Sequence, residues 1–382
     1  MNNNVYSTWL EINLGAIQNN INRLTEISGK PVMAILKANG YGHGLARVAL
    51  AVEASGVNWC GVARVEEALA LRRYGFKGHI LVLGFTPPLR VIEAASQGVS
   101  LAVYEPELIS AYSQLAQSAG ISIHLHLKFE TGMGRLGFPW QEGLSFTKWV
   151  KEQPGLIIEG MFTHFARADE PDQPSTNKQL ERFESLITEI TGTGLRPEWV
   201  HACNSAGALY FPRARFDIIR PGIALFGLHP SEQALLPDGF LPALSWKTRL
   251  VSVKELPSGH GISYGHRYVT QKMERIGVIA TGYADGYRRI NGNMVIVHGK
   301  KVPVIGNVCM DQCMVQLDTV PEANVGDEAV LIGSQENAKI TVEEVAKIWQ
   351  TVNYELVCGL ADRLPRVYFS GEGDEIHNNH HL

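Results

Sequence analysis

Eight short apolar segments that alternate with helical patterns constrain this chain more than any other feature of its sequence. Each segment is rich in β-branched residues, and successive segments begin roughly 20 to 45 residues apart. The segments are PVMAILK (31–37), NWCGVA (58–63), HILVLG (79–84), GVSLAV (98–103), ISIHLHLKF (121–129), LIIEGMFTHF (156–165), EWVHAC (198–203) and FDIIRPGIALFG (216–227). Eight strand–helix units in succession predict a (β/α)8 barrel, whose active site lies where the strands end.

The segments between these strands predict helices. The clearest patterns lie at 45–56, 64–75 and 177–194, where apolar residues recur at three- and four-residue spacing and the pattern stops at a glycine. After about residue 237 the texture changes to strands separated by turns rich in Gly and Pro, with one clear helical pattern at 342–352. The predicted strands of this second region are 244–253, 274–283, 293–306 and 327–333.

This change from alternating strands and helices to strands joined by turns predicts two domains. We predict a barrel over residues 1–237 and a mostly β domain over residues 238–382, with the junction in the proline-containing stretch 229–242. The first dozen residues are equally compatible with packing in the β domain. The chain ends in a polar tail, HNNHHL.

Composition excludes several function classes. The chain carries 34 Lys and Arg against 38 Asp and Glu, without a basic run, so it lacks the electrostatic footprint of a nucleic-acid-binding protein. Five scattered cysteines favour reduced thiols, and the close pair Cys309 and Cys313 lacks nearby partners for a structural metal. Because the chain has neither an apolar export signal nor 18 consecutive apolar residues, we expect a soluble, cytoplasmic protein with no membrane partner.

Lys37 is the strongest catalytic candidate by position. It ends the first predicted strand and is followed by the glycine-rich run ANGYGHG, which contains Tyr41. A lysine that emerges from an apolar strand at the catalytic rim is partly desolvated, which depresses the pKa of its amine and suits covalent chemistry with carbonyl groups. The glycines allow the backbone and Tyr41 to approach a ligand closely.

The fifth predicted strand places His124, His126 and Lys128 on one face, because strand side chains alternate. An H-x-H pair on a barrel strand is a zinc-binding arrangement, so a metal-dependent hydrolase is one alternative. It needs further ligands at later strand ends, where His164 is the one clear candidate and Arg220 is a poor neighbour for a cation. We therefore expect no metal.

The segment after this strand, TGMGRLG, spells G-x-G-x-x-G through Gly132, Gly134 and Gly137. In dinucleotide-binding folds the motif follows the first strand of a doubly wound sheet, whereas here it follows the fifth strand of a predicted barrel. The other interpretation is a tight loop that presents Arg135 to an anion.

Polar residues also mark the ends of the later strands. His164 ends the sixth strand, Asn204 and Ser205 follow the seventh, and Arg220 lies in the eighth. The Ser205 hydroxyl and the backbone N–H groups at 222–223 occupy the usual phosphate site of a barrel. In the second region, ISYG, GYADGYRR and GNVCMDQ each indicate only a turn or a strand end when taken alone.

Together and in order, these segments resemble the alanine racemase family. The resemblance rests on LKANGYGHG, KFETGMGRLG, FTHFARAD, HACNSAGAL, RPGIALFGL, ISYG, GYADGYRR, GNVCMDQ and NYE, spread over residues 36–355. It implies a pyridoxal 5'-phosphate enzyme, built from a (β/α)8 barrel and a C-terminal β domain, that interconverts L-alanine and D-alanine. It further implies a cytoplasmic homodimer with shared active sites, which supplies D-alanine for peptidoglycan.

The resemblance also implies residue roles. Lys37 looks like the lysine that holds the cofactor and acts as one base, and Tyr264 like the opposite base, contributed across the dimer. The matched cofactor-binding positions are Lys37, Tyr41, His164, Asn204, Ser205, Arg220, Gly222, Ile223 and Tyr354, with Arg220 facing the pyridine nitrogen and His164 bridging it to Tyr264. The remaining matches are Arg135 and Met310 for substrate binding, Lys128 for the lysine that can be carbamylated, and Tyr283 for the substrate channel.

The chain departs from the family pattern at several positions. Gly40 stands where many members have Ala, and Glu130 stands where Asp is usual. The ending CGLADRLPRVYF departs from the commoner RVPR version, so the sequence leaves the substrate channel near Arg363 and Arg366 undefined. There are three alternatives to this interpretation. A fold-related pyridoxal-phosphate amino-acid decarboxylase would carry a Gly-rich phosphate loop and a cross-subunit cysteine motif, neither of which the sequence contains. A cofactor-carrying regulatory protein related to the barrel alone would lack the β domain, and a racemase of broader amino-acid specificity is the third alternative.

Overall fold

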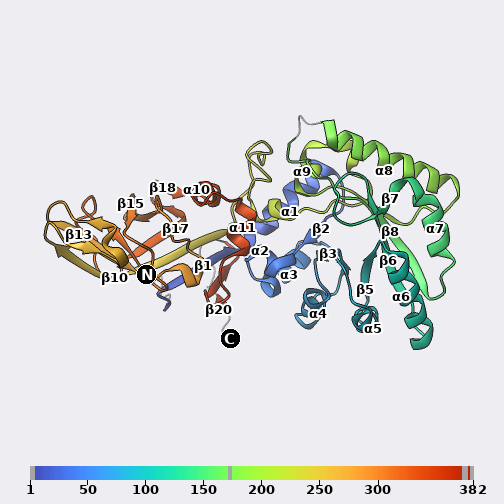
Figure 1. Cartoon of the computed structure of the whole chain (residues 1–382), viewed down its shortest axis with the longest axis horizontal. Helices are drawn as coiled ribbons and strands as arrows, with labels where there is room; N and C mark the ends of the chain where they lie inside the picture. Colours follow the sequence, from blue (N-terminus) through green and yellow to red (C-terminus); the bar gives the residue numbers. More distant parts are fainter. Residues whose placement is uncertain (1–4, 171–173, 372–376, 379–382) are drawn as a thin grey trace. The chain divides into compact units, whose positions relative to one another are not determined.

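The computed structural model describes residues 5–170, 174–371 and 377–378. It divides the chain into two compact units, which we call the barrel unit (Ala16–Leu241) and the β unit (Met1–Gly15 with Pro242–Leu382). Figure 1 shows the helices and strands of each unit. No helix in the described part of the chain is both long and apolar enough to cross a membrane.

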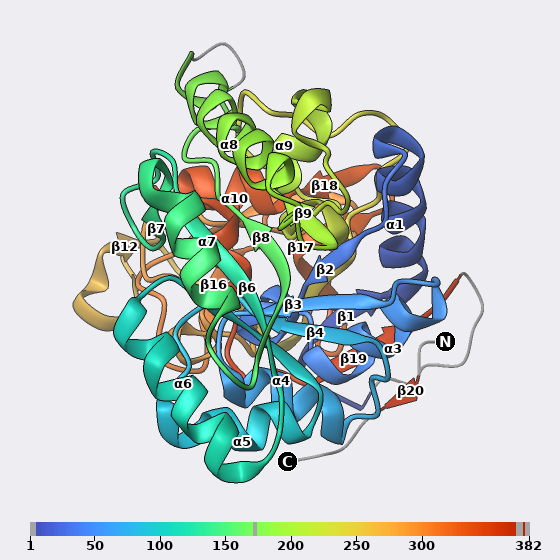
Figure 2. The ribbon, with the colours of Figure 1, turned by 90° about the vertical axis from the view of Figure 1, so that its right-hand side faces the viewer.

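The barrel unit is a curled parallel sheet surrounded by helices (Figure 2). Its strands run in the order β2–β3–β4–β5–β6–β8–β9, and β7 pairs with β6. The strands are β2 (Met33–Ile35), β3 (Trp59–Val62), β4 (His79–Val82), β5 (Val99–Val103), β6 (Ile123–Glu130), β7 (Phe138–Pro139), β8 (Leu156–Phe162) and β9 (Trp199–His201). Every residue of β3 and of β5 is buried, as expected for parallel strands covered on both faces.

Helices connect the barrel strands, although α2 is a turn with positive φ at residues 38–40 rather than a regular helix. They are α1 (Leu14–Ser28), α2 (Lys37–Tyr41), α3 (Leu45–Ala54), α4 (Val65–Arg73), α5 (Pro88–Ser96), α6 (Pro106–Ala119), α7 (Gly143–Lys151), α8 (Pro174–Gly192) and α9 (Ser205–Tyr210), with short 3-10 turns η1 (Trp140–Glu142), η2 (Pro212–Ala214) and η3 (Ile223–Phe226). Local chemistry sets their ends. Helix α6, for example, begins with Pro106 and ends at Gly120, which adopts the left-handed conformation that glycine tolerates best.

The eighth predicted barrel strand, 216–227, is reduced to an isolated bridge. Ile219 pairs in parallel with Val32, and residues 217 and 220 donate backbone hydrogen bonds to carbonyl oxygens at the end of the β9 segment. These bonds close the barrel between its last and first strands. A regular strand does not continue because Pro221 has no N–H to donate, and the chain turns into η3 instead.

The β unit is built on a ten-stranded sheet in the order β18–β17–β14–β15–β16–β13–β10–β1–β19–β20. Because β17 also pairs with β10, the strands from β17 to β10 form a closed ring. The strands of the unit are β1 (Thr8–Asn13), β10 (Leu244–Leu256), β11 (Gly261–Ile262), β12 (Tyr268–Val269), β13 (Glu274–Ile279), β14 (Met294–Val297), β15 (Lys300–Ile305), β16 (Cys313–Gln316), β17 (Glu328–Gln335), β18 (Ala338–Ile340), β19 (Arg366–Phe369) and β20 (His377–Asn378).

The structure near both ends of the chain differs in three places from the elements predicted from the sequence. Strand β1 pairs antiparallel with β10 and parallel with β19, so the start of the chain is part of the β-unit sheet. The predicted helix at 342–352 is shorter, α10 (Val342–Ile348), and a second helix, α11 (Asn353–Cys358), follows it. The first two residues of the predicted polar tail form β20, and residues 379–382 lie outside the described residues.

The predicted fold class, a (β/α)8 barrel with a mostly β domain, is confirmed.

Candidate active site

Lys37 lies directly after the first barrel strand, at the start of a left-handed turn. It is the first residue of α2, and its side chain is half-buried. Backbone φ is positive at every residue from 38 to 42, with 54° at Ala38 and 55° at Asn39. A left-handed conformation costs a non-glycine residue about 1–2 kcal/mol, so Lys37 is attached to a strained segment that its surroundings must hold in place.

Glu67 at the start of α4 holds this turn. Its Oε1 accepts a hydrogen bond from the N–H of Ala38 at 2.6 Å, while its Oε2 accepts from two N–H groups that precede α4. On the other side of the turn, Oδ1 of Asn39 accepts from the N–H of Leu45 at 2.8 Å. The segment after β2 is thereby tied to the segment after β3.

Arg220 lies inside the barrel, where it donates to neutral acceptors. Its Nη2 donates to the carbonyl oxygens of Thr163 at 2.9 Å and Ala202 at 3.1 Å, and lies 3.4 Å from Nδ1 of His164. Its Nη1 donates to Nδ1 of His201 at 2.7 Å. With five donors and no acceptor, the guanidinium is a fixed source of hydrogen bonds at this end of the barrel.

Burial and positive neighbours keep the two histidines at Arg220 neutral. Burial, followed by the charge of Arg220, holds the pKa of His164 and that of His201 well below the usual range. Burial also lowers the pKa of Arg220, to about 10, so the guanidinium remains charged at neutral pH. Each neutral ring therefore accepts at Nδ1 and carries its proton on Nε2.

Lys128 and Arg135 add positive charge near Arg220. Lys128 on β6 is 5% exposed, and burial, followed by the charges of Arg135 and Arg220, lowers the pKa of its amine to about 8. Its Nζ lies 5.4 Å from the centre of the Phe162 ring. Compared with an ordinary lysine, this amine has a larger neutral fraction near neutral pH, and the neutral form is the one that reacts with carbonyl carbon or carbon dioxide.

The glycine-rich loop after β6 is filled by a carboxylate of the protein itself. Glu130 accepts hydrogen bonds from the N–H groups of Gly132, Met133 at 2.6 Å, Gly134 at 2.8 Å and Arg135 at 3.4 Å. These donors are occupied and cannot cradle a pyrophosphate, so the dinucleotide interpretation of G-x-G-x-x-G is wrong. The loop instead presents Arg135, whose side chain is exposed.

The histidines of β6 do not form a zinc site. His126 is fully buried with Nδ1 2.8 Å from Nε2 of His201 and Nε2 3.2 Å from Oε2 of Glu159, so both ring nitrogens are engaged. His124 is half-exposed and lies 3.5 Å from the same carboxylate. Within residues 5–170, 174–371 and 377–378, no group of three or more His, Cys, Asp or Glu side chains is arranged to hold a metal ion.

A small polar cradle lies between the last two barrel segments. The buried Ser205 Oγ accepts from the N–H groups of Gly222 at 3.0 Å and Ala224 at 3.3 Å, next to Ile223 at the start of η3. The hydroxyl of Tyr41 reaches the same place, since a Cβ on Gly222 would stand 2.3 Å from it.

Asn204 supports this cradle from the adjacent helix. It caps α9 by accepting from the N–H of Gly207 at 2.9 Å, which fixes Ser205 as the first residue of that helix. The predicted phosphate-site residues of the barrel are therefore brought together.

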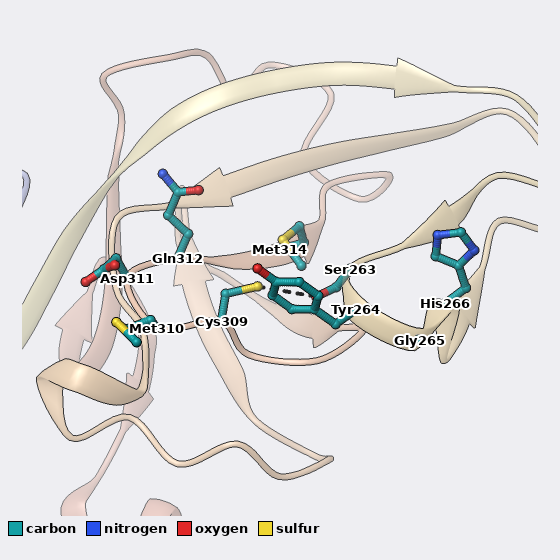
Figure 3. Close-up of a pocket in the computed structure, with 9 residues that line it drawn as sticks. All are labelled: Ser263, Tyr264, Gly265, His266, Cys309, Met310, Asp311, Gln312 and Met314. Atoms are coloured by element: carbon teal, nitrogen blue, oxygen red, sulfur yellow. Dashed lines mark hydrogen bonds between the residues drawn. The ribbon is translucent and has the colours of Figure 1, made fainter.

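The β unit carries a separate open pocket of about 660 Å³ around Tyr264 (Figure 3). Tyr264 begins a 3-10 turn, η4 (Tyr264–His266), and is 69% exposed, while Met310 across the pocket is 53% exposed. Ser263 sets the angle of the turn with φ of 62°, and its hydroxyl lies 3.4 Å from the sulfur of Cys309. The pocket therefore presents a phenol and a thioether to a ligand or to another molecule.

Tyr283 and Met310 lie on two loops joined by backbone hydrogen bonds. The N–H of Tyr283 donates to Cys309 O at 3.0 Å, and the next N–H donates to Met310 O at 2.9 Å. Arg363 links the same loops, because its Nε donates to buried Asp285 and its Nη2 to Asp311, each at 2.7 Å. The changed ending noted in the sequence thus contributes an arginine that orders the Met310 loop.

The last two predicted positions are also in the β unit. Tyr354 lies in the first turn of α11 with a half-buried side chain. Arg366, at the start of β19, is nearly buried and donates to Leu364 O at 3.2 Å. The predicted residues are thus divided between the two units. The barrel unit holds the two lysines, Arg135, Arg220, His164 and the cradle with Tyr41, and the β unit holds Tyr264, Tyr283, Tyr354 and Met310.

Sequence reasoning missed three residues that organise the barrel end. Glu67 accepts a hydrogen bond from the turn after Lys37, and Glu130 accepts hydrogen bonds from the N–H groups of the glycine-rich loop. His201 contacts Arg220. Only His201 carried a signal in the sequence, as a polar residue at the end of an otherwise apolar strand.

Comparisons with known proteins agree on one family. The alanine racemase N-terminal domain model matches residues 12–230, and the C-terminal domain model matches residues 243–368. The alanine racemase of Symbiobacterium thermophilum is 43% identical over 364 residues, which cover 94% of this chain and 97% of that protein.

Solved structures give the same result. Alanine racemase from Clostridium difficile 630 has a TM-score of 0.93 at 34% identity, covering 98% of this chain and 99% of that one. Alanine racemase from Bacillus anthracis with bound L-Ala-P has a TM-score of 0.92 at 38% identity, covering 98% of both chains. The chain belongs to the alanine racemase family and is an amino-acid racemase.

Proposed function

We propose that this protein interconverts L-alanine and D-alanine with pyridoxal 5'-phosphate as cofactor, and that Lys37 and Tyr264 are its two bases. Family membership supports alanine as the substrate. The observation that carries the rest is the grouping of a strand-end lysine, a buried arginine and a polar cradle within one end of the barrel.

The residues of the barrel unit fit the cofactor. Lys37 offers an amine to the aldehyde carbon, and the Ser205 and Tyr41 hydroxyls offer donors to the phosphate group beside Gly222. Glycine is required at 222 because a Cβ there would fill this cradle. When bound, pyridoxal 5'-phosphate supplies a ring that accepts negative charge from the α-carbon of the substrate.

Arg220 sets the electronic character of the site. Its guanidinium remains protonated, so toward a ring nitrogen it donates a hydrogen bond and cannot accept a proton. Arg220 would therefore hold the ring nitrogen of a bound cofactor in its unprotonated form. This would favour prompt return of the proton to the α-carbon of the substrate over side reactions.

Racemisation removes a proton from one face of the α-carbon and returns a proton on the other face. It therefore requires at least two acid–base groups, one on each face. Lys37 contributes an amine and Tyr264 a phenol, and each of these groups can accept a proton and return it. His164, neutral and bonded to Arg220, is suited to pass a hydrogen bond between the guanidinium and the phenol.

The exposure of Tyr264 supports a shared site. A phenol that is 69% exposed is surrounded by water and is poorly set to act as a base. We therefore propose a homodimer in which the pocket containing Tyr264 and Met310 is covered by the barrel of a second copy. Arg135 and Met310 then contact the substrate, Tyr283 lines its channel and Tyr354 contributes to phosphate binding. The D-alanine formed in the cytoplasm supplies peptidoglycan.

Optical rotation tests the reaction directly. Wild-type protein with pyridoxal 5'-phosphate and L-alanine should reach zero rotation, and D-alanine should reach the same end point from the opposite sign. Release of carbon dioxide and an amine would instead indicate the decarboxylase, and equal rates with serine or lysine would indicate a broader racemase. Unchanged rotation with all of these substrates would refute the proposal.

A further inference from the structure

A continuous line of hydrogen bonds crosses the interior of the barrel unit from Arg220 to Glu159. Arg220 Nη1 lies 2.7 Å from Nδ1 of His201, Nε2 of His201 lies 2.8 Å from Nδ1 of His126, and Nε2 of His126 lies 3.2 Å from Oε2 of Glu159. Arg220 is 3% exposed and the two imidazoles are fully buried, so water does not compete for these bonds.

The two ends of the line fix the direction of every bond in it. Arg220 can only donate and an ionised carboxylate can only accept. His201 must therefore accept at Nδ1 and donate from Nε2, and His126 must do the same toward Glu159. Burial lowers the pKa of both histidines, which favours the neutral rings that this arrangement requires.

Glu159 is held ionised at the far end of the line. Burial alone would raise the pKa of its carboxyl, but hydrogen bonds from His126 and Ser100 outweigh it and lower the pKa to about 2. Ser100 on β5 donates to the same oxygen at 2.5 Å. Glu159 borders a pocket of about 450 Å³ lined by the first residues of β4 and β5, at the opposite end of the barrel from Lys37.

We infer that Glu159 is a positioning residue for Arg220 and acts through His126 and His201. The inference rests on the proposed function, in which Arg220 faces the ring nitrogen of the cofactor. Without an acceptor at 159, His126 is free to move its proton to Nδ1 and His201 to follow. An N–H of His201 would then face an N–H of Arg220, and the guanidinium would have to move.

Two variants separate charge from hydrogen-bond direction. Glu159→Gln keeps an acceptor oxygen for His126 and should preserve the proton positions, whereas Glu159→Leu removes the acceptor. His126→Phe interrupts the line at its centre and keeps the ring volume, so it tests the inference if Glu159→Leu does not fold. His124→Gln is the matched control, because His124 contacts the same carboxylate from outside the line.

The direct readout is the proton position on His201, from long-range 1H–15N spectra of 15N-histidine-labelled holoenzyme. His201 should carry its proton on Nε2 in wild type, Glu159→Gln and His124→Gln. In Glu159→Leu and His126→Phe its 15N signals should shift, because the Nε2 proton has lost the line of acceptors that ends at Glu159. The same two disrupted variants should show a roughly tenfold lower kcat, a size typical for lost outer hydrogen bonds in a site, with little change in KM for alanine. The other two variants should stay near wild-type kcat.

Either of two results would overturn the inference. One is an unchanged His201 signal in both disrupted variants, whatever their activity, and the other is wild-type kcat in both despite a changed signal. Failure of the proposed function is distinguishable, since it would appear as a wild-type protein that does not racemise alanine, while the ring spectra do not depend on turnover.

Discussion

A Cβ atom on Gly222 would lie 2.3 Å from the hydroxyl oxygen of Tyr41, well inside contact distance. Gly222→Ala should therefore displace Tyr41 and disturb the phosphate cradle, at a cost of about 1–3 kcal/mol, which corresponds to a roughly 5- to 150-fold weaker cofactor affinity. Titration of the apo protein with pyridoxal 5'-phosphate measures this loss. Gly192→Ala is the control, because nothing lies within 4 Å of its added carbon, and wild-type affinity in Gly222→Ala would contradict the cradle.

Lys37 should be the residue that carries the cofactor. Reduction of the holoenzyme with borohydride should attach the cofactor permanently to the peptide that contains Lys37, because an amine there reacts with its aldehyde carbon. Peptide mapping by mass spectrometry identifies the labelled lysine. Lys128→Met is a matched control that should leave the label in place, and a label found on any other lysine would contradict the assignment.

Lys128 should make stability depend on pH. Its pKa in the folded protein is about 8, below the ordinary 10.5, so between these values the unfolded chain binds more protons and stability rises with pH. Lys128→Met lacks this contribution, and wild type should gain about 1–2 kcal/mol relative to it between pH 8 and 9.5. Urea unfolding in carbon-dioxide-free buffer measures the difference. Equal pH dependence in the two proteins would show that the amine is not desolvated.

Much of the barrel could be predicted because buried parallel strands leave unbroken apolar runs in the sequence. Strand ends then placed Lys37, Ser205 and Arg220 at one rim, since all strands of a parallel barrel point the same way. The eighth strand was predicted too long, because the apolar pattern continues past Pro221. Pro221 has no N–H to donate, so the strand pairing is limited to the bridge at Ile219.

Other features depend on contacts that a local pattern does not contain. Gly40 and Gly42 suggest a turn, but the positive φ of Ala38 is sustained by Glu67, 29 residues away. Likewise, alternation places His126 on a face of its strand, yet its partner His201 is 75 residues distant and meets it only when the barrel closes. Pairings of this kind become visible in the folded structure alone.

A shared active site should allow two inactive proteins to complement each other. Lys37→Ala lacks the barrel base and Tyr264→Phe lacks the β-unit base, so each homodimer should be inactive. After subunit exchange, a mixed dimer contains one intact site and should regain roughly a quarter of wild-type activity, since half of the dimers are mixed and each has one working site of two. Exchange is verified by native mass spectrometry, and absence of recovery after proven exchange would exclude sharing.

The two-base assignment is tested most directly by deuterium exchange at the α-carbon of alanine in D2O. Wild type should incorporate deuterium while it racemises either enantiomer. Tyr264→Phe should lose racemisation by roughly 100-fold or more, the size expected for removal of a general base, yet still exchange the α-proton of one enantiomer through Lys37. Wild-type racemisation by Tyr264→Phe, or equal exchange of both enantiomers, would contradict a mechanism with one base on each face.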